Sequence, residues 1–149
     1  GLSFDNMLPL EKAKKKGAEI RRAYMDAIPG LEDLVKDTRR VAERGSIRAI
    51  DKRQIHVDKE HKALNCLLQG SAAVIAKRWL LLTDSKLRGF THERYAFVHD
   101  EQILGAPLEN AEYLCDVCKL SALEAGEYYN LRLPIEADAQ IGDNWAQVH

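Results

Sequence analysis

The chain has 149 residues, of which 46% are hydrophobic and 30% charged, a composition that suits one globular domain with a hydrophobic core. No apolar run approaches the roughly 20 residues of a membrane span and no secretory signal opens the sequence, so we expect a cytoplasmic protein without a membrane partner. The net charge of −1 is unevenly spread, because residues 1–62 hold 15 Lys and Arg against 11 Asp and Glu, whereas residues 63–149 hold 7 against 12.

Hydrophobic periodicity predicts helices and short antiparallel strands. In chain order, the expected elements are a helix over residues 9–27, a helix over 31–43, strands over 47–50 and 54–57, a helix over 58–87, a hairpin over 95–104, a helix over 108–127 and a strand over 131–141. Gly45 fits the C-terminal cap of the second helix, and Asp58 is the expected N-cap of the longest one. The pattern predicts the α+β class, with helices packed on a small antiparallel sheet.

The hairpin predicted over residues 95–104 carries two acids at its tip. Asp100 and Glu101 lie between two apolar runs, at a place where two-residue turns usually have Asn-Gly or Gly-X because φ must be positive. Acids are a poor choice for stability there, and such departures often mark function. Carboxylates on a rigid hairpin suit a divalent metal and phosphoryl transfer, whereas a solvated turn is the alternative.

A second candidate site is a polar face on the longest predicted helix. His61, Asn65 and Gln69 are four residues apart and therefore share one helix face, which Ala72 and Ala73 continue with little bulk. Small side chains let a duplex approach closely, and Asn and Gln offer the donors and acceptors that suit the minor groove. The alternative is a polar helix face that meets water.

The three cysteines predict free thiols rather than a metal or redox site. An odd count without a secretory signal argues against a disulfide framework. Cys115 and Cys118 form a Cys-x-x-Cys pair, but no second pair accompanies them for zinc. Both fall on the apolar stripe of their predicted helix, so we expect them to pack in the core.

Three blocks of the sequence resemble family A DNA polymerases. Val98-His99-Asp100-Glu101 is similar to the C-terminal catalytic motif of the family, and residues 63–73 are similar to its Asn-x-x-x-Gln-Gly-(Ser/Thr)-Ala-Ala helix. Residues 141–145 are similar to its Gly-x-x-Trp ending. The blocks occur in the order of the family at similar spacings, and the last residues, 144–149, are most similar to phage replicative polymerases.

The resemblance implies a DNA-directed DNA polymerase that uses two-metal nucleotidyl transfer. In the family, two Mg²⁺ ions activate the primer 3′-hydroxyl and stabilise the leaving pyrophosphate. Carried onto this chain, Asp100 is the metal ligand, Glu101 is a supporting acid, and His99 contacts the primer terminus.

The resemblance also implies residues that contact DNA. Asn65 and Gln69 match the family's Asn and Gln, which contact the primer–template near the insertion site. His61 departs from the bacterial enzymes, which often have Arg there. Arg53 lies at the tip of the predicted basic hairpin, where it either contacts the duplex backbone or belongs to a solvated turn.

The resemblance implies part of a polymerase palm with part of the fingers, in a single domain over residues 1–149. Residues 9–57 then match the helices and hairpin that connect fingers and palm, and residues 58–149 the palm core. The strand with the first catalytic aspartate and the fingers helix of the family have no counterpart here. We therefore expect the chain to be inactive alone and to need the remaining polymerase polypeptide, primer–template DNA and deoxynucleoside triphosphates, with self-association as a further expectation.

Two other functions remain open from the sequence. One is a polymerase remnant that acts as a non-catalytic DNA-binding or partner-binding module. The presence of Asp100, Glu101, Asn65 and Gln69 favours the catalytic alternative, since a remnant has no need to keep them. The other is a standalone metallohydrolase, which is disfavoured because no further cluster of His, Asp or Glu accompanies Asp100.

Overall fold

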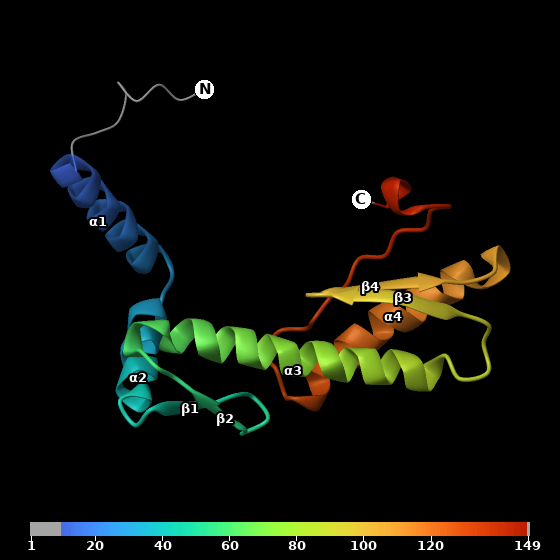
Figure 1. Cartoon of the computed structure of the whole chain (residues 1–149), viewed down its shortest axis with the longest axis horizontal. Helices are drawn as coiled ribbons and strands as arrows, with labels where there is room; N and C mark the ends of the chain where they lie inside the picture. The colour runs from blue at the N-terminus through green and yellow to red at the C-terminus, as the bar shows by residue number, and fades with distance from the viewer. Residues whose placement is uncertain (1–9, 149) are drawn as a thin grey trace. The chain divides into compact units, whose positions relative to one another are not determined.

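A computed structural model describes residues 10–148, so Pro9, where the first helix is predicted to begin, lies outside the described residues. The elements are α1 (Leu10–Ala27), α2 (Leu31–Ala42), β1 (Ser46–Arg48), β2 (Gln54–His56), η2 (Glu60–Lys62), α3 (Ala63–Lys86), β3 (Glu93–Val98), β4 (Glu101–Gly105), α4 (Leu108–Tyr128) and η3 (Trp145–Gln147) (Figure 1). Each sheet has two strands, β1 with β2 and β3 with β4. This architecture confirms the α+β class. No described helix is long and apolar enough to cross a membrane.

The chain forms two compact units. The described part of the first unit comprises residues 10–47 and 56–64, and that of the second comprises residues 48–55 and 65–148. The first unit contains α1 and α2, whereas the second contains most of α3, the β3–β4 hairpin and α4. The expectation that the whole chain behaves as one domain stays a prediction.

The turns around α2 follow the predicted glycine chemistry. Gly30 precedes α2 with φ of +82°, and Gly45 follows it with φ of +78°. The Gly45 N–H donates to the Ala42 carbonyl at 2.8 Å, which closes the last turn of the helix. Because only glycine adopts such φ values without strain, both ends of α2 are fixed by sequence.

The beginning of α3 differs from the prediction. The expected N-cap, Asp58, does not cap the helix, because a 3-10 turn over residues 60–62 precedes Ala63. The Asp58 carboxylate instead accepts a hydrogen bond from Lys62 Nζ at 2.9 Å. This bond lowers the pKa of Asp58. Lys62, four residues after Asp58, therefore binds the carboxylate that was expected to cap the backbone N–H groups of the helix.

The first hairpin is fixed to α3 within the second unit. Ser71 Oγ accepts a hydrogen bond from the Ile50 N–H at 3.2 Å. Beside it, a Cβ added to Gly70 would lie 2.3 Å from Ile55 Cδ1, so the absence of a side chain there leaves room for the strand. The Gly-Ser pair of the sequence motif therefore serves hairpin packing.

A small apolar cluster joins α3, α4 and the second hairpin. Leu87, Leu114 and Val117 are buried together, and Leu104 of β4 packs against them. This cluster explains why β3 and β4 form as a two-stranded hairpin, since an isolated hairpin is marginally stable in water without a packing surface.

The strand predicted over residues 131–141 is absent. The helix α4 ends in a Schellman motif, with Asn130 at φ of +53° and the Leu131 N–H donating to the Gly126 carbonyl at 3.2 Å. The chain then runs without a ladder partner, and Pro134 has no N–H to offer one. Alternation of apolar and polar residues was the right observation, but a strand also requires a neighbour.

Candidate active-site hairpin and its supporting helix

The two-residue turn of the β3–β4 hairpin is His99-Asp100, one position earlier than predicted. Val98 pairs with Glu101, so Glu101 is the first residue of β4 and not part of the tip. His99 has φ of +52°, the positive value that tight hairpin turns require and that Gly usually supplies. A non-glycine residue in this conformation costs about 1–3 kcal/mol.

The two side chains of the turn are more exposed to solvent than the side chain of the residue that follows. His99 and Asp100 are both exposed, whereas Glu101 is half-buried. Since Asp100 is the last residue before β4, its carboxylate stands at the end of a hydrogen-bonded ladder. A short turn between paired strands restricts its backbone, which is what a metal ligand needs.

Aromatic and polar contacts fix the hairpin on α3. The rings of Phe97 and Trp79 meet edge to face, with centroids 6.1 Å apart. Trp79 also donates a hydrogen bond through Nε1 to the Cys118 carbonyl at 2.8 Å, which ties α3 to α4. Trp79 is half-buried, and through these two contacts it joins α3 to both β3 and α4.

A polar network extends this anchoring. Arg94 bonds to the Asp84 carboxylate of α3 and to Gln102 Oε1 of β4, the latter at 2.5 Å. Gln102 in turn donates to Thr83 Oγ1 at 3.3 Å, and Thr83 is fully buried. A register shift between Arg94 and Ala96 makes Tyr95 the extra residue of a bulge. Such a bulge changes the direction of side chains along the strand.

One face of α3 carries both the residues that hold the β3–β4 hairpin and the residues predicted to contact DNA. The seam follows spacings of four and three residues through Asn65, Gln69, Ala72, Ala76, Trp79 and Thr83. Residues at these spacings share a helix face. Asn65 and Gln69 are exposed, whereas Trp79 and Thr83 hold the hairpin.

The hairpin points toward the polar end of this seam. Arg94 contacts α3 at Asp84, and three residues later Phe97 contacts it at Trp79, so β3 runs antiparallel to α3. The His99-Asp100 turn therefore extends toward the N-terminal half of α3, the half that carries Gln69 (Figure 1). The sequence predicted the polar helix residues and the acidic hairpin separately, and it did not indicate that one face of α3 carries both the polar residues and the contacts to the hairpin.

The remaining candidates lie elsewhere. Arg53 is on the β1–β2 hairpin, where its Nε contacts the Asp51 carboxylate at 2.6 Å. Partial desolvation opposes ionisation of Asp51, but the hydrogen bonds from Arg53 outweigh it and lower the pKa of Asp51. His61 is exposed in η2 and belongs to the first unit. The structure thus brings Asn65, Gln69 and the hairpin into one unit, with Arg53 on its other hairpin.

The donor set fits a magnesium site in part. An exposed carboxylate such as that of Asp100 is a ligand that Mg²⁺ prefers. Within residues 10–148, however, no group of three or more His, Cys, Asp or Glu side chains is arranged to hold a metal ion. The described residues by themselves therefore do not form a complete magnesium site.

The cysteines behave as packed thiols. Cys115 and Cys118 are free and half-buried on α4. Burial raises the pKa of both thiols, for Cys118 to about 11, with the neighbouring Cys115 adding to the effect. A raised thiol pKa opposes thiolate chemistry, which agrees with the predicted packing role. Trp145, which like Trp79 was expected to be a core anchor rather than a base-stacking platform, is instead 53% exposed.

The fold is that of part of a polymerase domain. The POL domain of Pol1 from M. smegmatis, solved in complex with DNA primer-template and dNTP, superposes with a TM-score of 0.72 at 24% sequence identity. The match covers 81% of this chain and 24% of that one.

Sequence comparison identifies the family. The family model for DNA polymerase family A matches residues 7–147, so the chain belongs to DNA polymerase family A. The DNA-directed DNA polymerases of Enterobacteria phage T3 and Escherichia phage T7 are each 28% identical to it over 160 residues, which cover 91% of this chain and 23% of theirs. DNA polymerase I of Bacillus caldotenax is 28% identical over 151 residues, 91% of this chain and 17% of its own. The chain thus spans less than a quarter of the length of these relatives.

Proposed function

We propose that the chain forms part of a template-directed DNA polymerase and supplies the metal-binding hairpin and the helix that contacts primer–template DNA. The reaction is nucleotidyl transfer to a primer 3′-hydroxyl in DNA replication, in a phage or prophage setting. The 149-residue chain is inactive alone, because nucleotidyl transfer of this kind uses two metal ions and more carboxylates than Asp100 and Glu101 provide.

The proposed role of each candidate residue is consistent with the exposure of its side chain. Asp100 carries the metal-binding carboxylate, Glu101 keeps the local charge negative, and His99 contacts the primer terminus. Asn65 and Gln69 present amides to the minor groove, where every base pair offers acceptors. His61 and Arg53 contact the DNA backbone, although Arg53 must share its guanidinium with Asp51.

The observation that carries this proposal is the shared face of α3. Exposed amides at Asn65 and Gln69 lie on the same seam as Trp79 and Thr83, which anchor the hairpin that bears Asp100. A metal-binding carboxylate and a duplex-facing surface on one rigid helix keep the primer end aligned with the reacting groups. The small side chain of Ala72 on the exposed part of the seam permits close approach of DNA.

Asp100 would hold Mg²⁺ together with ligands from the remaining polypeptide. When bound, the metal stabilises the negative charge that develops during phosphoryl transfer. The contribution of this chain is to fix the carboxylate on a two-residue turn, so that little ordering is needed when the metal binds.

Complementation tests the proposal. The purified chain is mixed with a phage T7 DNA polymerase from which the region matched by this chain has been deleted, and primer extension is measured with Mg²⁺ and all four deoxynucleoside triphosphates. We expect no extension by either polypeptide alone and template-dependent extension by the mixture. A second arm places this chain in the deleted polymerase as a fusion, in case the separate chains do not associate.

Absence of extension in both arms, with folded polypeptides and bound primer–template, would contradict the proposal. That outcome would favour the non-catalytic DNA-binding module. Extension by the isolated chain would contradict the claim that it is inactive alone.

A further inference from the structure

The bulge in β3 decides which side chains of the strand face α3. On a regular strand, residues three apart lie on opposite faces of the sheet. Arg94 bonds to Asp84 of α3, and yet Phe97, three residues later, also reaches this helix. Its ring packs on that of Trp79. The extra residue Tyr95 restores the shared direction, because the register of the strands shifts there. β3 is thereby held on α3 at two separate points.

Arg94 joins the helix to both strands of the hairpin. Its side chain is 21% exposed, and its guanidinium bonds to the Asp84 carboxylate of α3 and to Gln102 Oε1 of β4. Gln102 in turn donates to Oγ1 of the buried Thr83 at 3.3 Å, so both ends of its amide are fixed. Bonds from a guanidinium fork are directional, and a charged partner makes them stronger than bonds between neutral groups. The network lies within the second unit.

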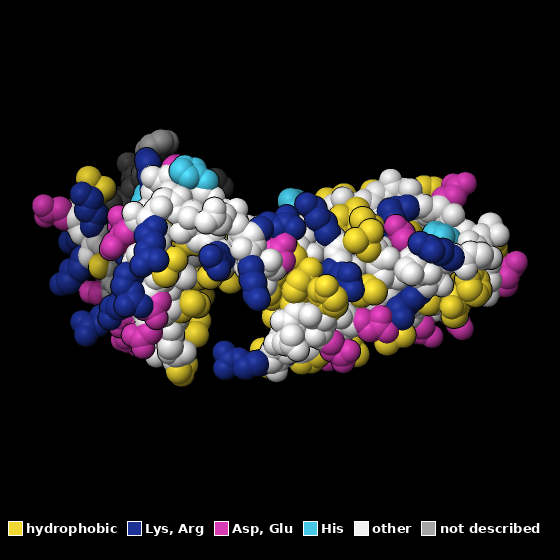
Figure 2. All heavy atoms as spheres, turned by 90° about the horizontal axis from the view of Figure 1, so that it is seen from below, with side chains coloured by type: hydrophobic (Ala, Val, Ile, Leu, Met, Phe, Trp, Pro, Cys, Tyr) yellow, Lys and Arg dark blue, Asp and Glu magenta, His cyan; other side chains and the backbone are white. Residues whose placement is uncertain are grey.

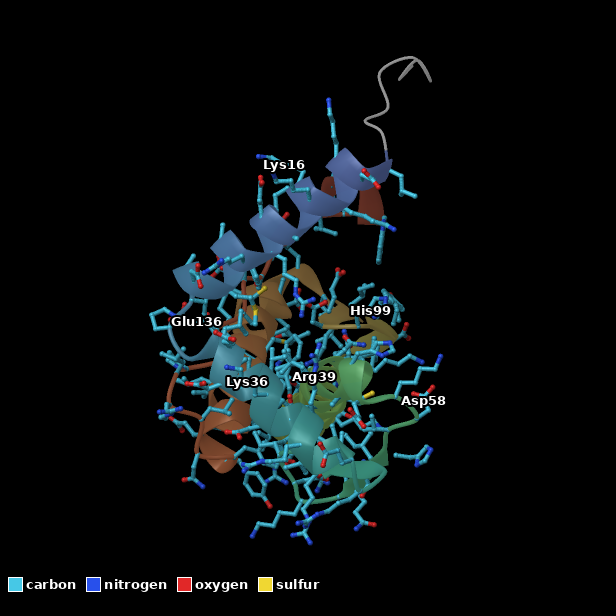
Figure 3. The ribbon with its side chains drawn as sticks, turned by 90° about the vertical axis from the view of Figure 1, so that its left-hand side faces the viewer. Lys16, Lys36, Arg39, Asp58, His99 and Glu136 are labelled. Atoms are coloured by element: carbon cyan, nitrogen blue, oxygen red, sulfur yellow. The ribbon has the colours of Figure 1, made fainter. Side chains whose placement is uncertain are left out.

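Two contact points determine the direction of the hairpin relative to α3. The contact of Phe97 by itself permits rotation, and the packing of Leu104 on the apolar cluster is non-directional. Arg94 holds β3 roughly 10 Å from Phe97, and Asp100 lies a similar distance beyond, at about 3.3 Å per residue. Figure 3 labels His99 in the same turn as Asp100. A rotation of about 10° at Phe97 would move the Asp100 carboxylate by roughly 2 Å, whereas a metal ligand has to be held within about 0.5 Å.

We propose that Arg94 is a positioning residue for the Asp100 carboxylate. By joining Asp84 of α3 to Gln102 of β4, Arg94 fixes the angle at which the turn extends from the helix. Its guanidinium is engaged within the protein, so its effect passes through the backbone of the hairpin and not through contact with a substrate. The role in nucleotidyl transfer rests on the proposed function, whereas the direction of the hairpin rests on the bonds of Arg94.

Residual dipolar couplings of the ¹⁵N-labelled chain test the direction of the hairpin. The couplings of the N–H bonds in β3, β4 and α3 report how the two strands are oriented relative to the helix. With Arg94→Met, the couplings of β3 and β4 should no longer fit the orientation of the unchanged chain, while those of α3 and α4 still fit. Arg94→Lys keeps the charge beside Asp84 but not the planar fork, so its couplings should lie between the two.

Arg78→Met is the matched control. Arg78 is also a half-buried arginine of the second unit, but its guanidinium lies 3.7 Å from the centroid of the Tyr128 ring of α4. The control therefore removes a guanidinium that contacts α4, and the couplings of β3 and β4 should keep their fit. Thermal unfolding measures the stability of each variant, and Arg94→Lys carries the test if Arg94→Met does not fold.

Kinetics separate positioning from a loss of folded protein. In the fused polymerase, Arg94→Met should lower kcat about tenfold to a hundredfold, since a misplacement of about 1 Å costs on this order. The KM for the deoxynucleoside triphosphate should stay within about twofold, because Arg94 is assigned no contact with the nucleotide. Arg94→Lys should recover part of kcat. Titration of active enzyme with primer–template corrects each kcat for unfolded protein.

The outcomes separate this inference from the proposed function. Unchanged couplings of β3 and β4 in Arg94→Met would overturn the inference, and so would altered couplings together with an unchanged kcat. If the fused polymerase is inactive even with Arg94 in place, the proposed function fails, and the couplings still decide whether Arg94 sets the direction of the hairpin.

Discussion

At the residue scale, two backbone positions show how local geometry sets the shape of a turn and the packing of a helix. His99 accepts a positive φ that glycine would adopt without strain, and it does so beside the exposed Asp100. Gly126 shows the opposite case, in which the residue without a side chain is required by packing. A Cβ there would lie 2.9 Å from Ile135 Cγ1 and 3.4 Å from the Ile135 backbone nitrogen.

Gly126→Ala should destabilise the protein by about 1–3 kcal/mol, because the new methyl group would lie too close to Ile135. The contact includes the backbone of Ile135, so a change of side-chain rotamer alone cannot relieve it. Urea unfolding followed by Trp fluorescence measures the change. Gly17→Ala is the control, since a Cβ at Gly17 has no atom within 4 Å and alanine has the higher helix propensity. An equal or higher stability of Gly126→Ala would show that residues 131–137 do not pack on α4 as described.

The Cys118 thiol predicts a pH dependence. Burial raises its pKa to about 11, above the ordinary thiol value of 9.0. The protonated thiol is therefore favoured in the folded state, so its contribution to stability is complete below pH 9 and is lost as the pH rises toward 11. Alkylation with iodoacetamide at pH 8 should be roughly 100-fold slower at Cys118 than in the urea-unfolded chain. Equal rates in the two states would contradict the burial.

At the element scale, the β3–β4 hairpin depends on α3 for its position. The Phe97–Trp79 contact, the Arg94 network and the packing of Leu104 all act on the same two-stranded sheet. Because the sheet has two strands in the described chain, most of its stability has to come from this packing.

Trp79→Phe should therefore loosen the hairpin as well as destabilise the second unit. The smaller ring loses part of the edge-to-face contact with Phe97 of the hairpin, and the change also removes the bond from Trp79 Nε1 to the Cys118 carbonyl, at a cost of about 1–2 kcal/mol. Hydrogen exchange should speed up at Phe97 and Gln102 more than at Leu114. A uniform increase at all three sites would show global destabilisation without a specific effect on the hairpin.

The elements that the sequence predicted correctly are those that local chemistry decides. The helices α1, α2 and α4 begin and end close to their predicted residues because periodicity, glycine and proline mark them. The turn at His99-Asp100, the bulge at Tyr95 and the missing strand over residues 131–141 depend on which partner pairs with which residue. Strand pairing is set by tertiary structure, so composition and alternation could not reveal it.

The residues of the candidate site were likewise predictable from the sequence only in part. Motif resemblance supplied Asp100, Asn65 and Gln69, but Arg94 and Gln102 carried no sequence signal. Their roles come from bonds between β3, β4 and α3, which become visible only once the strand register is known.

At the scale of the whole molecule, large apolar side chains are left exposed. Leu108 is 81% exposed, Leu133 is 78% exposed and Tyr95 is 67% exposed. Figure 2 shows hydrophobic side chains interspersed with charged ones on the face seen there. Scattered apolar side chains alone are common on protein surfaces, but the β3–β4 sheet also has only two strands among the described residues, so its edges can pair with another chain.

We therefore predict that the chain self-associates and that a complementing polymerase fragment suppresses self-association. Sedimentation velocity over a hundredfold range of concentration measures both effects. The sedimentation coefficient should rise with concentration for the chain alone, and a defined heterodimer should replace the larger species in the mixture. A monomer at every concentration, with no complex in the mixture, would contradict this prediction.

The central claim is that the Asp100 carboxylate takes part in nucleotidyl transfer, and primer extension by an Asp100→Asn variant in the complemented or fused polymerase tests it most directly. We predict a loss of activity of about a thousandfold or more, because metal-ion stabilisation of the transition state is worth several kcal/mol. Asp116→Asn, which changes an exposed acid on α4, should leave activity within twofold of the unchanged chain. Full activity of Asp100→Asn, with normal folding and DNA binding, would contradict the account.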